Sequence, residues 1–246
     1  MGAAIVSTRI LVVNDNADVG FNYAPVLQGL GDITHDVSAF LLNPYHFKLV
    51  QFTGGADITP SWYGDTSPKG ICSCDTARDE MEAKIFRKAQ KTGIKMAGIC
   101  RGMQFLNVMC GGKMVHHLSG HAGGNHTVKT SCGENSGPFL VNSYHHQMCI
   151  PPSDALIIAW SHTKRSDIYI GDGDEEMRWY GPEVEALYIP GERMLGVQWH
   201  PEALEESHKG RRFYVELVRD YLEMTVLIFR KKYFGVRDGI TRTLQV

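Results

Sequence analysis

Long apolar runs are missing from this sequence of 246 residues. A membrane-spanning helix needs about 20 consecutive, predominantly apolar residues, and no run approaches that length. The first twenty residues lack a basic stretch followed by an apolar core and a cleavage site, so we expect no signal peptide. These two absences favour a cytoplasmic protein that has no membrane partner.

Cysteine is also sparse, since six cysteines are too few for a disulfide scaffold in a chain of this length. Cys72 and Cys74 are separated by one residue instead of two, and no second pair stands at zinc spacing. Adjacent His145 and His146 would face opposite ways on a strand and could not readily share an ion. We therefore predict no metal site and no cofactor.

Neither sign of charge dominates, because the formal net charge is −2. A nucleic-acid partner is therefore not expected. Repeats, low-complexity tracts and Pro/Ser-rich linkers are missing as well, although 43% of the residues are hydrophobic and 21% charged, which is typical of globular proteins. We predict a single domain over residues 1–246, with a core at about 9–224 and a C-terminal extension at 225–246.

Strand and helix patterns alternate along the chain, which predicts an α/β fold: a mostly parallel central sheet with helices on both faces. Strands are expected at residues 9–15, 48–55 and 94–100, and helices at 76–93 and 101–110. Further strands are expected within residues 139–145, 155–161, 184–189 and 194–200, followed by a helix at 208–224.

Cys100 lies where one of these strands turns into a helix, between Gly98 and Gly102. Small neighbours permit a tight, strained turn of the kind that presents a nucleophile at the carboxyl edge of a sheet. A helix N-terminus behind the sulfur favours the thiolate. By itself this arrangement also fits a buried, inert cysteine.

Two further residues near the end of the chain favour the reactive interpretation. His200 and Glu202 alternate across Pro201, so their side chains are expected to point the same way. A nucleophilic thiol needs an imidazole as its base, and the imidazole needs a carboxylate to fix its tautomer. Cys100, His200 and Glu202 together supply all three groups.

The segments GICRGMQ and GVQWHPE around these residues resemble the two signature segments of class I glutamine amidotransferases. Three more segments resemble the stand-alone γ-glutamyl hydrolase branch (γ-glutamyl-GABA hydrolase-like) of that superfamily: TGGADITPSWYG, ARDEMEAKIF and VNSYHHQ. The matches span roughly residues 48 to 222. The resemblance implies a three-layer, flavodoxin-like α/β fold and a cysteine hydrolase that requires no cofactor.

The resemblance also implies roles for individual residues. Cys100 would attack a γ-glutamyl carbonyl and form a thioester, with His200 as base and acid and Glu202 orienting it. Backbone N–H groups of Arg101 and of Gly54 or Gly55 would bind the oxyanion. The groups that hold the glutamyl amino and carboxylate ends would be Gln104 and the backbone around Ser143, Tyr144 and His145.

Two alternatives to a stand-alone γ-glutamyl hydrolase stay open. The chain could be a glutaminase subunit that supplies ammonia to a synthetase on a separate chain, since these residues contain no synthetase domain. It could instead be a non-catalytic binding protein on the same fold.

Four regions have weaker interpretations. Residues 14–47 are expected to help wall the active site, and 165–183 to form a long hairpin connection with Trp179 and Tyr180 near the pocket mouth. His116, His117, His121 and His126 are interpreted as polar loop residues or substrate contacts. In the extension, Val226 to Phe229 are expected to pack on the body or to mediate self-association or contact with a synthetase.

Overall fold

A nine-stranded sheet forms the centre of the molecule in the computed structural model, which describes residues 8–14, 21–131 and 137–235. The strands lie in the order β2 (Asp32–Thr34), β1 (Arg9–Val13), β3 (Phe47–Phe52), β4 (Lys95–Ile99), β13 (Met194–Val197), β12 (Val184–Ile189), β10 (Leu156–Ser161), β7 (Asn125–Thr130) and β8 (Phe139–Asn142).

The first five strands in this order are mutually parallel, and the remaining four join antiparallel to their neighbours. Four of the five parallel strands are buried almost throughout, as expected for strands covered on both faces, whereas β2 at the edge of the sheet is exposed or half-buried. The predicted α/β sheet is confirmed, and its antiparallel strands gather on one side of the parallel part.

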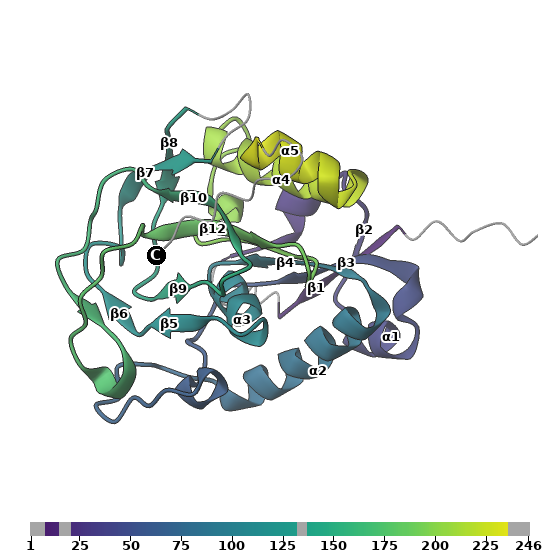
Figure 1. Ribbon diagram of the computed structural model, residues 1–246. Coiled ribbons are helices and arrows are strands. Elements are labelled where there is room, and N and C mark those ends of the chain that lie inside the picture. Colours follow the sequence, from purple (N-terminus) through teal and green to yellow (C-terminus); the bar gives the residue numbers. More distant parts are fainter. Residues whose placement is uncertain (1–7, 15–20, 132–136, 236–246) are drawn as a thin grey trace, which may run out of the picture.

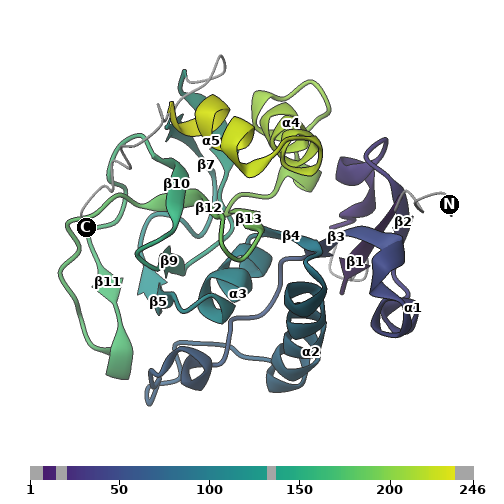
Figure 2. The same cartoon turned by 45° about the vertical axis from the view of Figure 1, so that its right-hand side comes forward.

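Helices cover both faces of the sheet (Figures 1 and 2). One face carries α1 (Val37–Leu42), α2 (Thr76–Thr92) and α3 (Arg101–Met109), and the other carries η2 (Ala24–Leu27), α4 (Lys209–Glu223) and α5 (Val226–Phe234). Alternate residues of each strand enter the two cores: Leu11 and Val13 pack on the α2 side, and Ile10 and Val12 on the α4 side. This is a three-layer arrangement.

The ends of α2 explain why the sequence pattern located this helix well. Asp75 caps its N-terminus by accepting a hydrogen bond from the Arg78 N–H at 3.0 Å. Gly93 ends it in the left-handed conformation, with φ 69°. Both signals are local, so the sequence alone locates this helix.

Two small two-stranded sheets lie beside the antiparallel half. They pair β5 (Lys113–Val115) with β9 (Met148–Ile150), and β6 (His117–Leu118) with β11 (Tyr169–Ile170). Short 3₁₀ turns complete the chain: η3 (Pro44–His46), η4 (Pro60–Tyr63), η5 (Asp172–Asp174) and η6 (Pro201–Ala203). None of the helices in the described residues is both long and apolar enough to cross a bilayer.

Only part of the C-terminal extension packs as expected. Phe229 and Tyr233 are buried on α5, whereas Val226, Leu227 and Ile228 are 46%, 64% and 53% exposed. Phe229 therefore packs on the body, whereas for Val226, Leu227 and Ile228 the expected self-association or synthetase contact stays a prediction. Residues 236–246 of the extension, and residues 15–20 of the segment expected to wall the site, lie outside the described residues.

Candidate active site

Cys100 follows β4 directly and stands at the N-terminus of α3. Its backbone has φ 51° and ψ −113°, a conformation that non-glycine residues rarely adopt. The Cys100 N–H donates to the Val197 carbonyl of the neighbouring strand at 2.8 Å, and Cys100 is 6% exposed. The expected strand–turn–helix is thus present, and its strain falls on the predicted nucleophile.

Two glycines allow α3 to approach the sheet at this turn. A Cβ atom on Gly98 would lie 2.4 Å from the Gly102 carbonyl carbon and from the Met103 nitrogen. A Cβ atom on Gly102 would lie 2.4 Å from the Phe52 carbonyl oxygen on β3. A residue other than glycine therefore fits at neither position unless the backbone moves. This agrees with the expectation that small residues beside Cys100 permit the tight turn.

His200 and Glu202 follow β13, the strand next to β4. The Nδ1 atom of His200 lies 2.5 Å from a Glu202 carboxylate oxygen, and His200 is 4% exposed. Asn142 fixes the His200 backbone by accepting from its N–H and donating to its carbonyl, both at 2.8 Å. Asn142 belongs to one of the segments that carry the family resemblance, but no role was predicted for it.

The charges around His200 favour an imidazolium. Burial lowers the pKa of His200, but Cys100 and then Glu202 outweigh it and raise that pKa to about 10. The imidazole thus interacts with the Cys100 sulfur on one side and with the Glu202 carboxylate on the other. This order of groups suits a thiolate–imidazolium pair oriented by a carboxylate.

The loop after β3 lies against both of these residues. A Cβ atom on Gly54 would come within 2.9 Å of the His200 Cε1 atom and 3.7 Å of the Cys100 Cβ atom. The Gly54 N–H donates to the Tyr23 hydroxyl at 3.1 Å. That bond occupies the Gly54 N–H.

A buried network of charges holds the same loop. Arg78 on α2 donates to the Gly54 carbonyl at 2.9 Å and the Thr53 carbonyl at 3.1 Å. Its Nε atom donates to Glu82 at 2.8 Å, and Glu82 with Asp79 also pairs the buried Arg101 side chain. This network was not predicted, although two acids on the apolar face of the expected helix were a signal for it.

Aromatic side chains surround His200. Phe21 stacks on the His200 ring with the centroids 4.9 Å apart, and Tyr144, which is 53% exposed, packs edge-on at 5.7 Å. Tyr23 lies at 6.5 Å. Phe21 and Tyr23 come from the segment that was expected to wall the site, and both rings lie beside the His200 ring.

The residues predicted to hold the substrate differ in burial and in distance from Cys100. Gln104 is buried, and its amide donates to the Gln198 side chain at 3.2 Å; the Gln198 amide in turn lies 3.6 Å from the Cys100 sulfur. The N–H groups of Ser143 and His145 already donate to the carbonyls of Gly124 and His121. The side chains of these two residues are buried, so only Tyr144 of this segment is exposed beside His200.

The interpretation of four histidines as loop residues needs correction, because His117 lies on β6 and His126 on β7. His116, His121 and His126 are at most 4% exposed, and His117 is half-buried.

The 165–183 segment connects β10 to β12, which pair antiparallel, so the predicted hairpin connection is confirmed. Within it, Trp179 packs on Tyr169 and is buried, while Tyr180 is 87% exposed. Asp172 and Asp174 of this connection accept hydrogen bonds from Thr66, Ser67 and Lys69.

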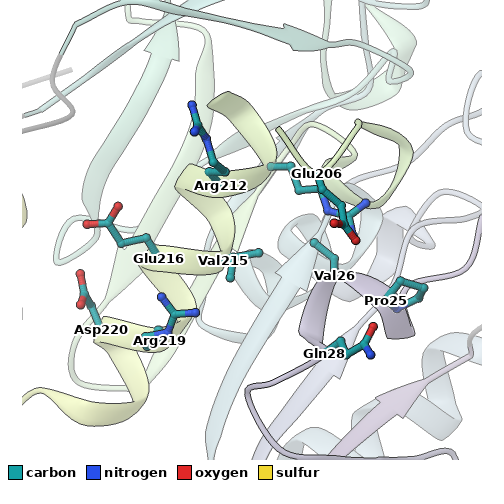
Figure 3. A pocket seen from close by; sticks show the side chains of 10 residues that line it. Pro25, Val26, Gln28, Glu206, Arg212, Val215, Glu216, Arg219 and Asp220 are labelled. Atoms are coloured by element: carbon teal, nitrogen blue, oxygen red, sulfur yellow. The ribbon is translucent and has the colours of Figure 1, made fainter. Parts of the chain in front are cut away.

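A groove of about 830 Å³ lies elsewhere, between η2 and α4 (Figure 3). Its lining mixes both signs of charge and includes none of the predicted site residues: Pro25, Val26, Gln28, Glu206, Arg211, Arg212, Val215, Glu216, Arg219 and Asp220. We assign it no role in the chemistry at Cys100.

Comparison with known proteins agrees with this architecture. Residues 45–164 match the family model Peptidase C26. Rv2859c of Mycobacterium tuberculosis, provisionally named a glutamine amidotransferase, is 33% identical over 167 residues, which are 61% of this chain and 49% of that protein. The glutamine amidotransferase-like protein YvdE of Lactococcus lactis is 27% identical over 175 residues, 64% of this chain and 67% of that one.

The carbamoyl phosphate synthase small chain of Brucella ovis is 29% identical over 147 residues, 58% of this chain and 32% of its own. A solved glutamine amidotransferase of Thermotoga maritima shares the fold, with a TM-score of 0.54 at 15% identity and coverage of 88% and 84% of the two chains. The chain is therefore similar in sequence to proteins named as glutamine amidotransferases, and it shares the fold of a solved one.

The same fold is found in a Thermoplasma acidophilum protein that is provisionally named a GMP synthase subunit. Its TM-score is 0.56 at 19% identity, covering 88% of this chain and 92% of that one. This chain spans about half the length of the Mycobacterium tuberculosis relative. These similarities therefore support the fold and leave the substrate to be argued from the site.

Proposed function

We propose that this protein hydrolyses a γ-glutamyl amide bond and releases glutamate, with Cys100, His200 and Glu202 as its catalytic triad. The observation that carries the proposal is the strained Cys100 turn beside an imidazole that a carboxylate holds at 2.5 Å. Buried structural cysteines do not need a backbone at φ 51° or a charged imidazole partner.

The reaction begins when the Cys100 thiolate attacks the γ-carbonyl carbon, forming a C–S bond and an oxyanion. The N–H groups of Arg101 and Gly55 would donate to that oxyanion, since the Gly54 N–H is occupied by the Tyr23 hydroxyl. One such donor typically lowers the barrier by about 2.7–4 kcal/mol. His200 then protonates the leaving amine as the C–N bond breaks. Water attacks the resulting thioester while His200 accepts its proton, and glutamate and the free thiol are released.

Glutamate release from a panel of compounds tests this proposal. The panel contains glutamine, γ-glutamyl amine conjugates, γ-glutamyl peptides and poly-γ-glutamates, and the control protein is Cys100→Ala. We expect release from one class of conjugate, lost in the variant by a factor of at least about 10³. Release that persists in Cys100→Ala would contradict the assignment of the nucleophile.

A second candidate is a glutaminase subunit that delivers ammonia to a synthetase. It is favoured by the similarity to the carbamoyl phosphate synthase small chain and by the fold shared with the protein named for GMP synthase. Weak hydrolysis of glutamine alone, rising when a synthetase chain is added, would select this candidate over the stand-alone hydrolase.

A non-catalytic binding role remains the third candidate, and thiol reactivity separates it from the other two. Burial raises the pKa of Cys110 and of Cys149, and burial with the neighbouring Cys72 raises that of Cys74 to about 11. An active site should make Cys100 react with substoichiometric iodoacetamide at neutral pH before those three. Equal labelling of the four thiols would favour the binding role.

A further inference from the structure

Five buried ionisable side chains cluster behind the segment that holds Tyr144. They are the imidazoles of His121, His126 and His145 and the carboxylates of Glu183 and Glu185, none more than 4% exposed. Glu185 lies on β12, His126 on β7, and the other two histidines on loops after β6 and β8. The proposed reaction at Cys100 uses none of these side chains.

Hydrogen bonds fix the tautomers of two of the histidines. The Nδ1 atom of His145 lies 2.9 Å from the Gln147 carbonyl oxygen, which can only accept, so this nitrogen carries the hydrogen. The Nε2 atom of His121 lies 3.1 Å from a Glu183 oxygen and likewise donates. In a neutral ring the opposite nitrogen then carries a lone pair and no hydrogen. These nitrogens are Nε2 of His145 and Nδ1 of His121.

Both lone pairs face Glu185. The Nδ1 atom of His121 lies 3.5 Å, and the Nε2 atom of His145 3.7 Å, from the same oxygen of Glu185. The Nε2 atom of His126 lies 2.9 Å from that oxygen, and the Ser143 hydroxyl lies 3.5 Å from His121 Nδ1. His145 Nε2 and the second oxygen of Glu185 have no hydrogen-bond partner among the described residues. Two lone pairs and a carboxylate that converge in a buried space repel one another unless a cation lies between them.

The spacing suits a metal ion better than a shared proton. Ligand atoms from His121, His145 and Glu185 all lie within 4.8 Å of one another. Tetrahedral zinc, with bonds of about 2.0–2.1 Å, separates its ligand atoms by roughly 3.3 Å, close to the spacing of these nitrogens from Glu185. A proton shared between such a nitrogen and the Glu185 oxygen would instead bring the two atoms to about 2.9 Å, the usual length of a hydrogen bond.

The surroundings of these groups are those of metal ligands. Each imidazole has its other nitrogen held by an acceptor, a carboxylate for His121 and a backbone carbonyl for His145. Glu183 is itself fixed by the Tyr169 hydroxyl at 2.7 Å and the Ser166 N–H at 2.8 Å.

We propose that His121, His145 and Glu185 bind a divalent transition-metal ion, with Zn²⁺ the ion that two imidazoles and one carboxylate suit best. The site is structural, because its ligands are buried. It ties the segment at 143–147 to β12, where the Glu185 carbonyl accepts from the Gln198 N–H at 2.7 Å. The adjacent His146 points to Asp57 and takes no part.

Metal binding by the full-length protein tests this site. Chelator-treated protein is titrated with Zn²⁺ in competition with a chromogenic chelator, and separately with Co²⁺ while visible absorption is recorded. We expect one equivalent of Zn²⁺ to bind, and Co²⁺ to give the intense bands of a tetrahedral complex.

Adjacent histidines provide a matched pair of variants. His146→Gln should bind Zn²⁺ as the parent does, whereas His145→Gln should bind it at least about tenfold more weakly. Circular dichroism of the apo forms shows whether each variant is folded. The titration of the unmutated protein needs no variant and decides the matter alone if His145→Gln fails to fold.

Two results would overturn the proposal. The first is the absence of stoichiometric binding to the unmutated protein, which would leave a hydrogen-bonded cluster neutralised by protons. The second is equal affinity in His145→Gln and the parent, which would place the ion elsewhere. Neither result depends on the identity of the substrate, so this test stands apart from that of the proposed function.

Discussion

His200 is the residue at which burial and charge compete most directly. Burial favours the neutral imidazole, and the adjacent Cys100 and Glu202 favour the charged one and raise its pKa from 6.5 to about 10. A group whose pKa rises on folding adds stability that is complete below its unfolded pKa and disappears as pH rises through the folded one. For His200 this window runs from about pH 6.5 to about 10.

We therefore expect His200→Asn to cost most stability at about pH 6 and progressively less towards pH 10. The comparison is made by urea unfolding of both proteins at several pH values, so that groups common to both cancel. A difference that stays constant, or grows with pH, would show that His200 is not charged in the folded protein.

Among the elements, the N-terminus of α3 depends on the closest packing in the site. A Cβ atom at Gly98 would meet backbone atoms at 2.4 Å, which cannot move without displacing the helix. We expect Gly98→Ala to cost at least about 3 kcal/mol of unfolding free energy. At Gly191 an added Cβ would come no closer than 3.8 Å to its neighbour, so Gly191→Ala is a matched control with little effect.

Urea unfolding of the two variants measures this difference. Equal stabilities of Gly98→Ala and Gly191→Ala would mean that α3 can move away from β4 at little cost. That outcome would remove the steric reason for the strained turn at Cys100.

The contact of Arg78 on α2 with the loop after β3 leads to a prediction about the rate of the reaction. Arg78 holds two carbonyls of that loop, and loss of this contact should loosen the proposed oxyanion donor at Gly55. We expect Arg78→Gln to lower kcat by about 10²-fold or more with a smaller change in KM. Steady-state kinetics on the conjugate that proves to be hydrolysed supply the measurement.

Exposed Arg87 on the same helix offers the control, and Arg87→Gln should leave both constants unchanged. A change in KM alone for Arg78→Gln would instead place Arg78 in substrate binding. A fall in stability without a change in kcat would make it purely structural.

For the molecule as a whole, the question is whether α5 belongs to the folded body. Phe229 is 1% exposed and packs against Tyr188, Tyr221 and Tyr233, with its ring centroid 4.8, 6.0 and 4.6 Å from theirs. Two residues away, Leu227 is 64% exposed. The two side chains thus differ in burial while sharing one short helix.

We expect Phe229→Ala to lower the unfolding free energy by about 3–5 kcal/mol, and Leu227→Ala by less than about 0.5 kcal/mol. Denaturant titration of the full chain checks both values. Similar small costs for the two variants would mean that the extension is dispensable for the stability of the central domain.

Local patterns in the sequence were sufficient for the elements that carry Cys100 and His200. Capping residues bound α2, and apolar runs of the right length mark β4 and β13. The strand–turn–helix at Cys100 was predictable because Gly98 and Gly102 stand on either side of Cys100. The distance between His200 and Glu202 follows from their positions two residues apart at the end of one strand.

Contacts between distant segments could not be predicted in this way. The histidine–glutamate cluster joins residues about sixty positions apart, and Arg78 reaches a loop more than twenty residues before it. Burial of Phe229 and exposure of Leu227 depend on which face of α5 meets the sheet. The sequence by itself determined the strands and the helix that carry the three groups proposed for the reaction, and those groups themselves, because short-range sterics and hydrophobic period decide them. Only the tertiary structure decided which polar groups meet in the interior, because that depends on how the layers pack.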